Sequence, residues 1–227
     1  MVGRRLSDHA RPGLSRRIAS AHHPVMLDAD VVGDVEGDAV AVAREAGYFE
    51  DERPDARVLC VRLLGSAPSF VPMRLGAALA TVEGKSRVFV RRGIAPELAR
   101  WLVLHEVGEW HHARIGYVGE DVEERCNLFA SCLTAPRPVY RALVKRLGLA
   151  HGALARALAT TQSVTFLRSG EVYGYPTLLV RAAGSIVRGQ PFGWPSLSLR
   201  QAEAVRHPNV TRVSVMGETR RVGLRAA

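Results

Sequence analysis

The stretch PELARWLVLHEVGEWHHAR, residues 96–114, predicts a long amphipathic helix. Pro96 stands where a helix would begin, and Glu97 lies in the first turn, where a carboxylate is favourable. A spacing of three and four places seven residues on one face of this helix: Leu98, Trp101, Leu102, His105, Gly108, Glu109 and His112. That face is apolar at its start and ionisable at its end, so the predicted helix both packs and carries reactive groups.

The reactive end of the helix opens like a metal site and then departs from the usual pattern. His105 and Glu106 form the first half of an H-E-x-x-H motif, but Glu109 stands where the second histidine belongs. Residues four positions apart lie one turn apart, about 6 Å along the axis, so His105 and Glu109 can reach one ion. In H-E-x-x-H proteases the middle glutamate binds no metal and activates the metal-bound water.

A second helix follows, and it offers further ligands. Its sequence, VEERCNLFASCLTA (122–135), ends at Pro136. A third ligand for such a site usually comes from another helix. Glu123 and Glu124 lie at the start of this one, and Asn127 lies one turn on from Glu123.

The segments LVLHEVGEW (102–110) and EERCNLFASCLTAP (123–136) together resemble the ImmA/IrrE family of metallopeptidases. That family pairs an H-E-x-x-H helix with a helix of pattern E-x-x-A-N-x-F-A and a leucine-rich turn ending in proline. The likeness covers residues 86–136 well and 36–170 loosely, and it does not extend to 171–227. It implies an α+β fold: a zincin-like core with a small sheet and an active-site helix, then a helical hairpin and a C-terminal β segment.

The resemblance also implies a role for each matching residue. His105 would be a zinc ligand, Glu123 the third ligand and Glu106 the catalytic general base. Asn127 and Phe129 match the N-x-F-A core and would be structural residues near the site. The implied activity is metal-dependent cleavage of a protein partner, since the family is associated with cutting helix-turn-helix repressors in phage-like mobile elements and stress responses.

Glu109 is where the sequence departs from the family. Carboxylate oxygen does ligate zinc, so His105, Glu109 and Glu123 form a candidate three-ligand set. Two carboxylates would cancel the charge of a divalent ion and leave its bound water less acidified than in a two-histidine site. An oxygen-rich site also shifts selectivity from zinc towards harder ions such as manganese.

A different arrangement uses His112 as a metal ligand. Glu109 and His112 have the Glu-x-x-His spacing of di-metal helices. His112 lies about 10 Å along the axis from His105, which is too far for easy sharing of one ion on a straight helix. The neighbouring His111 points off this face and is expected to be exposed.

A second class of function is a binding protein without turnover, which sequesters a regulator or contacts DNA through its basic surface. LARALATTQSVTFLRSG (154–170) has the look of a helix-turn-helix, in which Gln162, Ser163, Thr165 and Arg168 would face the bases. Ordinary helical hairpins share this pattern, and they are the favoured interpretation here. Metal content of the purified protein separates the enzyme from the binder.

The remaining elements are predicted from local pattern. Residues 37–47 have helical spacing, and a third helix over 137–148 ends at a glycine. The stretches 56–64 and 86–92 are rich in β-branched and apolar residues and are expected to be strands, whereas 75–84 fits either a helix or a strand. Further helices are expected at 152–172 and further strands at 175–181, 209–215 and 219–225, the last two as a hairpin. The organisation expected is a basic tail (1–25), a metallopeptidase-like domain (26–150), helix-turn-helix-like helices (151–172) and a C-terminal β segment (173–227).

Composition limits the class of protein. The 227 residues carry a formal net charge of +9, 47% hydrophobic residues and no apolar run long enough to cross a bilayer. No secretory signal follows the arginines of the N-terminus, so the expected location is the cytoplasm and no membrane partner is expected. Three cysteines, Cys60, Cys126 and Cys132, form no disulfide framework. Nucleic acid stays a candidate partner on charge alone.

Overall fold

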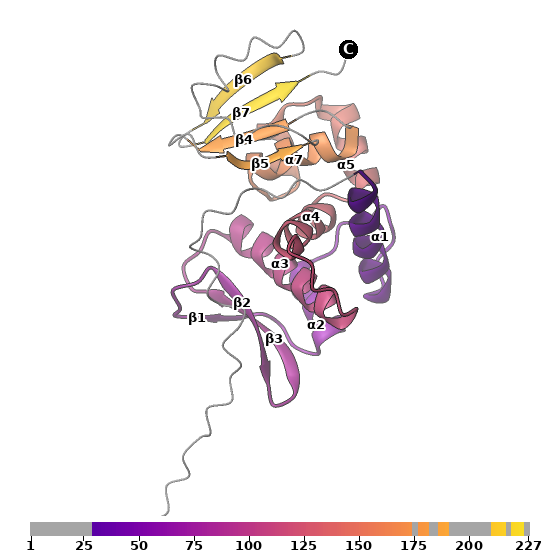
Figure 1. The fold of residues 1–227 in the computed structure, drawn as a ribbon, viewed down its shortest axis with the longest axis vertical. Coiled ribbons are helices and arrows are strands. Elements are labelled where there is room, and N and C mark those ends of the chain that lie inside the picture. The colour runs from indigo at the N-terminus through magenta and orange to yellow at the C-terminus, as the bar shows by residue number, and fades with distance from the viewer. Residues whose placement is uncertain (1–28, 174–176, 182–185, 191–209, 217–218, 225–227) are drawn as a thin grey trace, which may run out of the picture.

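The computed structural model describes residues 29–173 and, beyond them, the backbone of four strands at 177–181, 186–190, 210–216 and 219–224. The basic tail expected at 1–25 lies outside the described residues. Seven helices and two sheets make up the part that is described, so the fold is α+β as the sequence predicts (Figure 1). None of the described helices is both long and apolar enough to cross a bilayer.

A small mixed sheet stands at one end of the molecule, away from the C-terminal strands (Figure 1). Its strands are β1 (Ser69–Val71), β2 (Ala77–Val82) and β3 (Lys85–Arg91), in the order β1-β3-β2. β3 pairs parallel with β1 and antiparallel with β2. The strand expected at 86–92 is therefore confirmed, and the ambiguous stretch 75–84 is a strand that turns through Glu83 and Gly84, both at positive φ.

The strand expected at 56–64 is wrong, because these residues form helix α2 (Ala56–Leu64). The Asp55 side chain accepts a hydrogen bond from the Val58 N–H at 2.9 Å, which caps the first turn. Gly65 ends the helix in the left-handed conformation, with φ of 74°. Val58 and Val61, whose β-branching suggested a strand, lie on the exposed side of the helix.

The core is built around two helices packed side by side, α3 (Pro96–Arg114) and α4 (Val122–Thr134). Both have the bounds that the sequence predicts, to within a residue. α1 (Ala29–Glu45) packs against α4, and it begins before the helix expected from residue 37. Cys126 and Cys132 are buried in α4, as small apolar side chains would be.

Three shorter helices follow: α5 (Arg137–Leu147), α6 (His151–Ala157) and α7 (Gln162–Tyr173). α6 and α7 form the expected hairpin, and the Thr161 hydroxyl accepts the Val164 N–H at 3.3 Å where α7 begins. Thr165 and Arg168, two of the four residues that a DNA-reading helix would expose, are fully buried. The hairpin therefore packs against the rest of the described fold, as expected of an ordinary helical hairpin.

A buried charge network anchors α7 to the core. The Arg168 guanidinium is fully buried, and it donates to Glu36 of α1 at 2.7 Å and to Glu171 at 3.2 Å. Its Nε donates to the Ala135 carbonyl at the end of α4 at 2.8 Å. Arg137 also pairs with Glu36, and its Nη1 reaches the Val172 carbonyl at 3.1 Å. α1, α5 and α7 therefore meet at one set of ion pairs, which a hydrogen bond ties to the end of α4.

The C-terminal segment is a four-stranded antiparallel sheet in the order β5-β4-β7-β6. Its strands are β4 (Thr177–Arg181), β5 (Ile186–Gln190), β6 (Val210–Met216) and β7 (Thr219–Leu224). The three strands expected in this region are confirmed, including the β6–β7 pairing in which Met216 lies opposite Thr219. β5 was not predicted, because a glycine near its end and a following Pro-Gly stretch read as a loop.

Candidate metal centre

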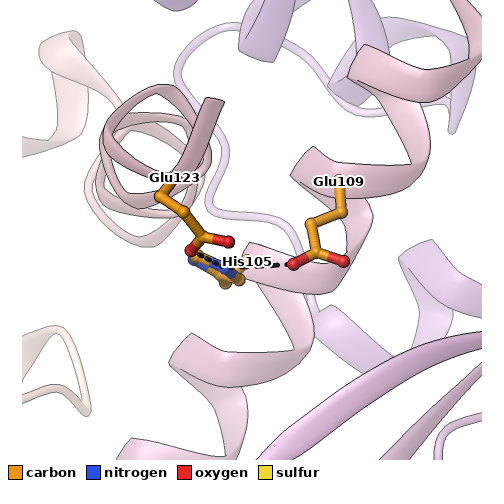
Figure 2. A group of neighbouring side chains, drawn as sticks. All are labelled: His105, Glu109 and Glu123. Atoms are coloured by element: carbon orange, nitrogen blue, oxygen red, sulfur yellow. Dashed lines mark ion pairs between the residues drawn. The ribbon is translucent and has the colours of Figure 1, made fainter. Parts of the chain in front are cut away.

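α3 and α4 bring together the three residues predicted as ligands (Figure 2). His105 Nε2 lies 3.6 Å from a Glu109 carboxylate oxygen on its own helix and 3.6 Å from a Glu123 oxygen on the neighbouring helix. One ligand-type atom from each residue falls within 4.8 Å of the other two. The imidazole lies between the two carboxylates, so the expected convergence of His105, Glu109 and Glu123 is confirmed.

Spacing of the donor atoms fits a single divalent ion. With bonds of about 2.1 Å, two ligand atoms on one tetrahedral zinc lie about 3.4 Å apart. The two separations of 3.6 Å from His105 are close to that value, and all three ligand-type atoms lie within 4.8 Å of one another. The His105 side chain is nearly buried, whereas Glu109 and Glu123 are 27% and 48% exposed, so the group opens to solvent on its carboxylate side.

Asn127 and Trp101 hold the His105 ring in place. Asn127 Oδ1 lies 3.1 Å from His105 Nδ1, and the Trp101 ring lies against the imidazole with centroids 5.5 Å apart. A proton on Nδ1 donated to Asn127 Oδ1 leaves Nε2 as the ring atom that faces the carboxylates and would bind an ion, as in histidines that bind metals. Asn127 was expected to be structural, and its contact makes it the residue that orients His105.

The two carboxylates also control the charge of His105. Burial disfavours the imidazolium, but Glu109 and Glu123 outweigh it and raise the pKa of His105 to about 9. Without an ion the ring is therefore protonated at neutral pH, and an ion must displace that proton to bind.

Glu106 lies beside the group and is almost completely buried. Burial, reinforced by the charge of Glu109 and opposed by His105, raises the pKa of Glu106 to about 7. Its Oε2 atom has no hydrogen-bond partner, and among the described residues no arginine forms an ion pair with it. A carboxylate with these properties can accept and release a proton near neutral pH.

The two histidines that follow belong to the core and not to this group. His112 Nδ1 lies 2.8 Å from the Gly108 carbonyl and 3.5 Å from the Cys126 sulfur, so the structure does not place His112 with His105. The expectation that His111 is exposed is wrong: only 4% of it is accessible. α1 covers that side of α3 with Asp38 at 3.5 Å, and the His111 ring stacks on Phe129.

Gly108 lies where α3 and α4 approach each other closely beside the site, a role that the sequence pattern does not show. A Cβ at this position would lie 3.1 Å from a Phe129 ring carbon and 3.3 Å from the Cys126 Cα. Both are shorter than a normal carbon–carbon contact of about 3.5–4.0 Å. The glycine therefore allows α3 and α4 to approach closely enough for Glu123 to reach His105.

A cavity of about 230 Å³ lies elsewhere, between α1 and the α4–α5 junction. Cys132, Leu133 and Pro136 line one side, and none of the metal-site residues contributes to it.

Comparison with known proteins adds a fold likeness. No protein-family model matches the chain, and no curated protein matches it. Among solved structures, a Mycobacterium tuberculosis transcriptional regulator matches with a TM-score of 0.52 and 16% sequence identity, over 71% of this chain. The match spans 56% of that regulator's length, and at this identity it shows a shared fold alone.

Proposed function

We propose that His105, Glu109 and Glu123 bind one divalent metal ion, and that the protein is a metal-dependent endopeptidase of the ImmA/IrrE type with a zincin-like core. The observation that carries the proposal is the convergence of the three ligand-type side chains from α3 and α4 within 4.8 Å. Their mixture of one imidazole and two carboxylates suits zinc and also tolerates manganese.

The protein's own groups have distinct roles in this proposal. Asn127 fixes the His105 ring, and the two glutamates complete the ligand set. A bound ion would polarise the scissile carbonyl and lower the pKa of a water molecule. Glu106 accepts the proton of the attacking water and then donates it to the leaving amine. Its pKa of about 7 suits both transfers at neutral pH.

The proposed substrate is a protein partner, with a helix-turn-helix repressor as the first candidate. This part of the proposal rests on the family resemblance of residues 102–110 and 123–136. Glu109 in place of histidine predicts slow turnover, because two carboxylates leave less positive charge to acidify the water.

Metal titration tests the ligand set. Protein without a histidine tag is stripped with a chelator and titrated with zinc or manganese in a calorimeter. We expect one ion per chain, and we expect Glu123→Ala to weaken binding beyond the roughly 10–100-fold typical of an outer-shell change. Glu124→Ala is the matched control, since it removes the neighbouring charge on α4. Equal loss in both variants, or no binding by the wild type, would refute the ligand set.

Cleavage of a co-expressed repressor tests the reaction. Glu106→Gln keeps the shape of the side chain and removes the proton acceptor. We therefore expect unchanged metal stoichiometry and no cleavage product on a gel. Cleavage that survives in this variant would remove Glu106 from the mechanism.

The second candidate function is a peptidase-like regulator that binds its partner without cutting it. The name of the structural neighbour, a transcriptional regulator, favours this alternative. Metal binding by the wild type with no cleavage of any tested partner, with zinc or manganese supplied, would favour the regulator.

A further inference from the structure

The C-terminal segment that contains the second sheet carries most of the chain's net positive charge. Residues 174–227 contain eight arginines, no lysine and two glutamates, which is +6 of the formal +9 of the whole chain. The four strands themselves contain arginines but no acidic residue. This concentration is independent of the metal centre, which lies on α3 and α4.

The strand register sorts the arginines onto one face. Residues directly opposite each other in neighbouring strands share a face, and successive residues alternate between faces. Arg188 of β5 pairs with Leu179 of β4, which pairs with Arg221 of β7. Arg181 pairs with Thr219, two positions from Arg221, and Arg212 pairs with Gly223, two positions on the other side. We call the positions of Arg181, Arg188, Arg212 and Arg221 the arginine face; each strand contributes one.

The opposite face of the sheet is apolar. The same alternation assigns to it Leu178, Val180, Ile186, Val213, Val215 and Val222, with Arg220 as its one charged position in the described strands. An antiparallel sheet with one apolar and one polar face packs the apolar face on the protein and leaves the polar face for solvent or a partner. α7 packs against β4 and β5, so the sheet has helical structure to cover one of its faces.

We propose that the arginine face binds the phosphate backbone of double-stranded DNA without reading its sequence. With about 4.8 Å between strands and about 3.4 Å between residues, the four positions span about 14 Å in each direction. That span reaches phosphates on both sides of a major groove, which is about 12 Å wide. Guanidinium groups suit phosphate because they bind it in a bidentate manner.

The composition of the four β-strands favours double-stranded over single-stranded DNA as the ligand. Proteins that bind single strands stack the bases on aromatic side chains. None of the four strands contains an aromatic residue, so the sheet offers no stacking platform. An acidic protein surface would satisfy the charges equally well, and it is therefore an alternative that the experiment must exclude.

The test is the salt dependence of binding by the full-length protein. Fluorescence anisotropy with a labelled 30-base-pair duplex measures affinity between 50 and 200 mM salt. Four phosphate contacts predict a slope of log affinity against log salt of about −3.6, which is about a 150-fold loss over that range. Arg181, Arg188, Arg212 and Arg221 are then all changed to Gln, and we expect the slope to fall near zero.

A matched control separates the face from bulk charge. Changing Arg57, Arg91, Arg141 and Arg146 to Gln removes the same charge from exposed positions on the other elements, and the slope should stay near that of the wild type. If the fourfold sheet variant does not fold by circular dichroism, Arg181→Gln and Arg221→Gln are tested singly, and each should reduce the slope by about 0.9. Equal loss in the control, a wild-type slope near zero, or tighter binding to single-stranded DNA or polyglutamate would overturn the proposal.

Discussion

Replacing Gly108 by alanine tests whether close packing of α3 and α4 builds the metal centre. Two effects oppose each other in this variant. Alanine favours a helix over glycine by about 1 kcal/mol. The new Cβ, however, would lie 3.1 Å from a Phe129 ring carbon and 3.3 Å from the Cys126 Cα, several tenths of an ångström too close. Phe129 is fully buried and stacks against His111, so its ring cannot move aside freely.

Overpacking of this kind costs about 1–3 kcal/mol. Gly37→Ala is the matched control, because Gly37 is an exposed helical glycine with nothing within 4 Å of an added Cβ. We expect Gly37→Ala to stabilise the protein by about 1 kcal/mol. Gly108→Ala should fall about 1–3 kcal/mol below that control, which places it between roughly neutral and about 2 kcal/mol less stable than the wild type.

Urea denaturation with a common m-value measures the free energy of unfolding of both variants. Calorimetric titration with zinc then measures the site itself. A shift of α4 that relieves the clash moves Glu123 away from His105, so zinc affinity should fall in Gly108→Ala and stay unchanged in Gly37→Ala. Equal stabilisation by the two alanines would show that Gly108 imposes no packing constraint, and the reasoning would fail.

Three further predictions concern the ligands and the charge network. Glu109→His should tighten zinc binding, because it replaces a carboxylate with a neutral imidazole and restores the two-histidine, one-carboxylate ligand set of zinc peptidases; equal or weaker affinity by calorimetry would place Glu109 away from the ion. Asn127→Ala should weaken zinc binding by about 10–100-fold through loss of the contact that orients His105, and a change below threefold would contradict that role. Burial opposes ionisation of Glu36, yet Arg137 and Arg168 outweigh it and hold the pKa of Glu36 below its ordinary value. Ionised Glu36 therefore stabilises the fold above the ordinary glutamate pKa, and this contribution is lost as the pH falls below it. In Glu36→Gln the free energy of unfolding should fall less steeply between pH 5 and 3 than in the wild type, as urea denaturation at each pH would measure.

The sequence predicts best where the pattern is long and local. The sequence predicts the helix at 96–114 with its observed bounds, because the nineteen residues begin with a proline and carry apolar side chains at 3–4 spacing. The pairing of His105 with Glu109 follows from one turn of that helix. Glu123 follows only from the family resemblance, because nothing local links it to His105, and its carboxylate lies 3.6 Å from His105 in the structure.

The predictions fail where tertiary contacts or a short helix cap determine the local structure. The residues 56–64 combine two valines with other apolar residues, as a strand does, and only the Asp55 cap and the burial of Leu59 and Cys60 reveal a helix. His111 looked exposed because no local pattern shows that α1 covers that side of α3. The order β5-β4-β7-β6 was likewise beyond prediction, since long-range pairing leaves no local signal.

The ion pairs around Arg168 also determine how the protein can be shortened. The metallopeptidase-like domain is expected to end at residue 150. A protein truncated there would lose Arg168 and Glu171. Glu36 would keep Arg137 as its remaining arginine partner in the network. Removing one member of a buried ion pair costs about 3–5 kcal/mol, a large share of the 5–15 kcal/mol that stabilises a typical domain. The smallest unit worth expressing for metal studies therefore ends after Val172, whose carbonyl accepts from Arg137.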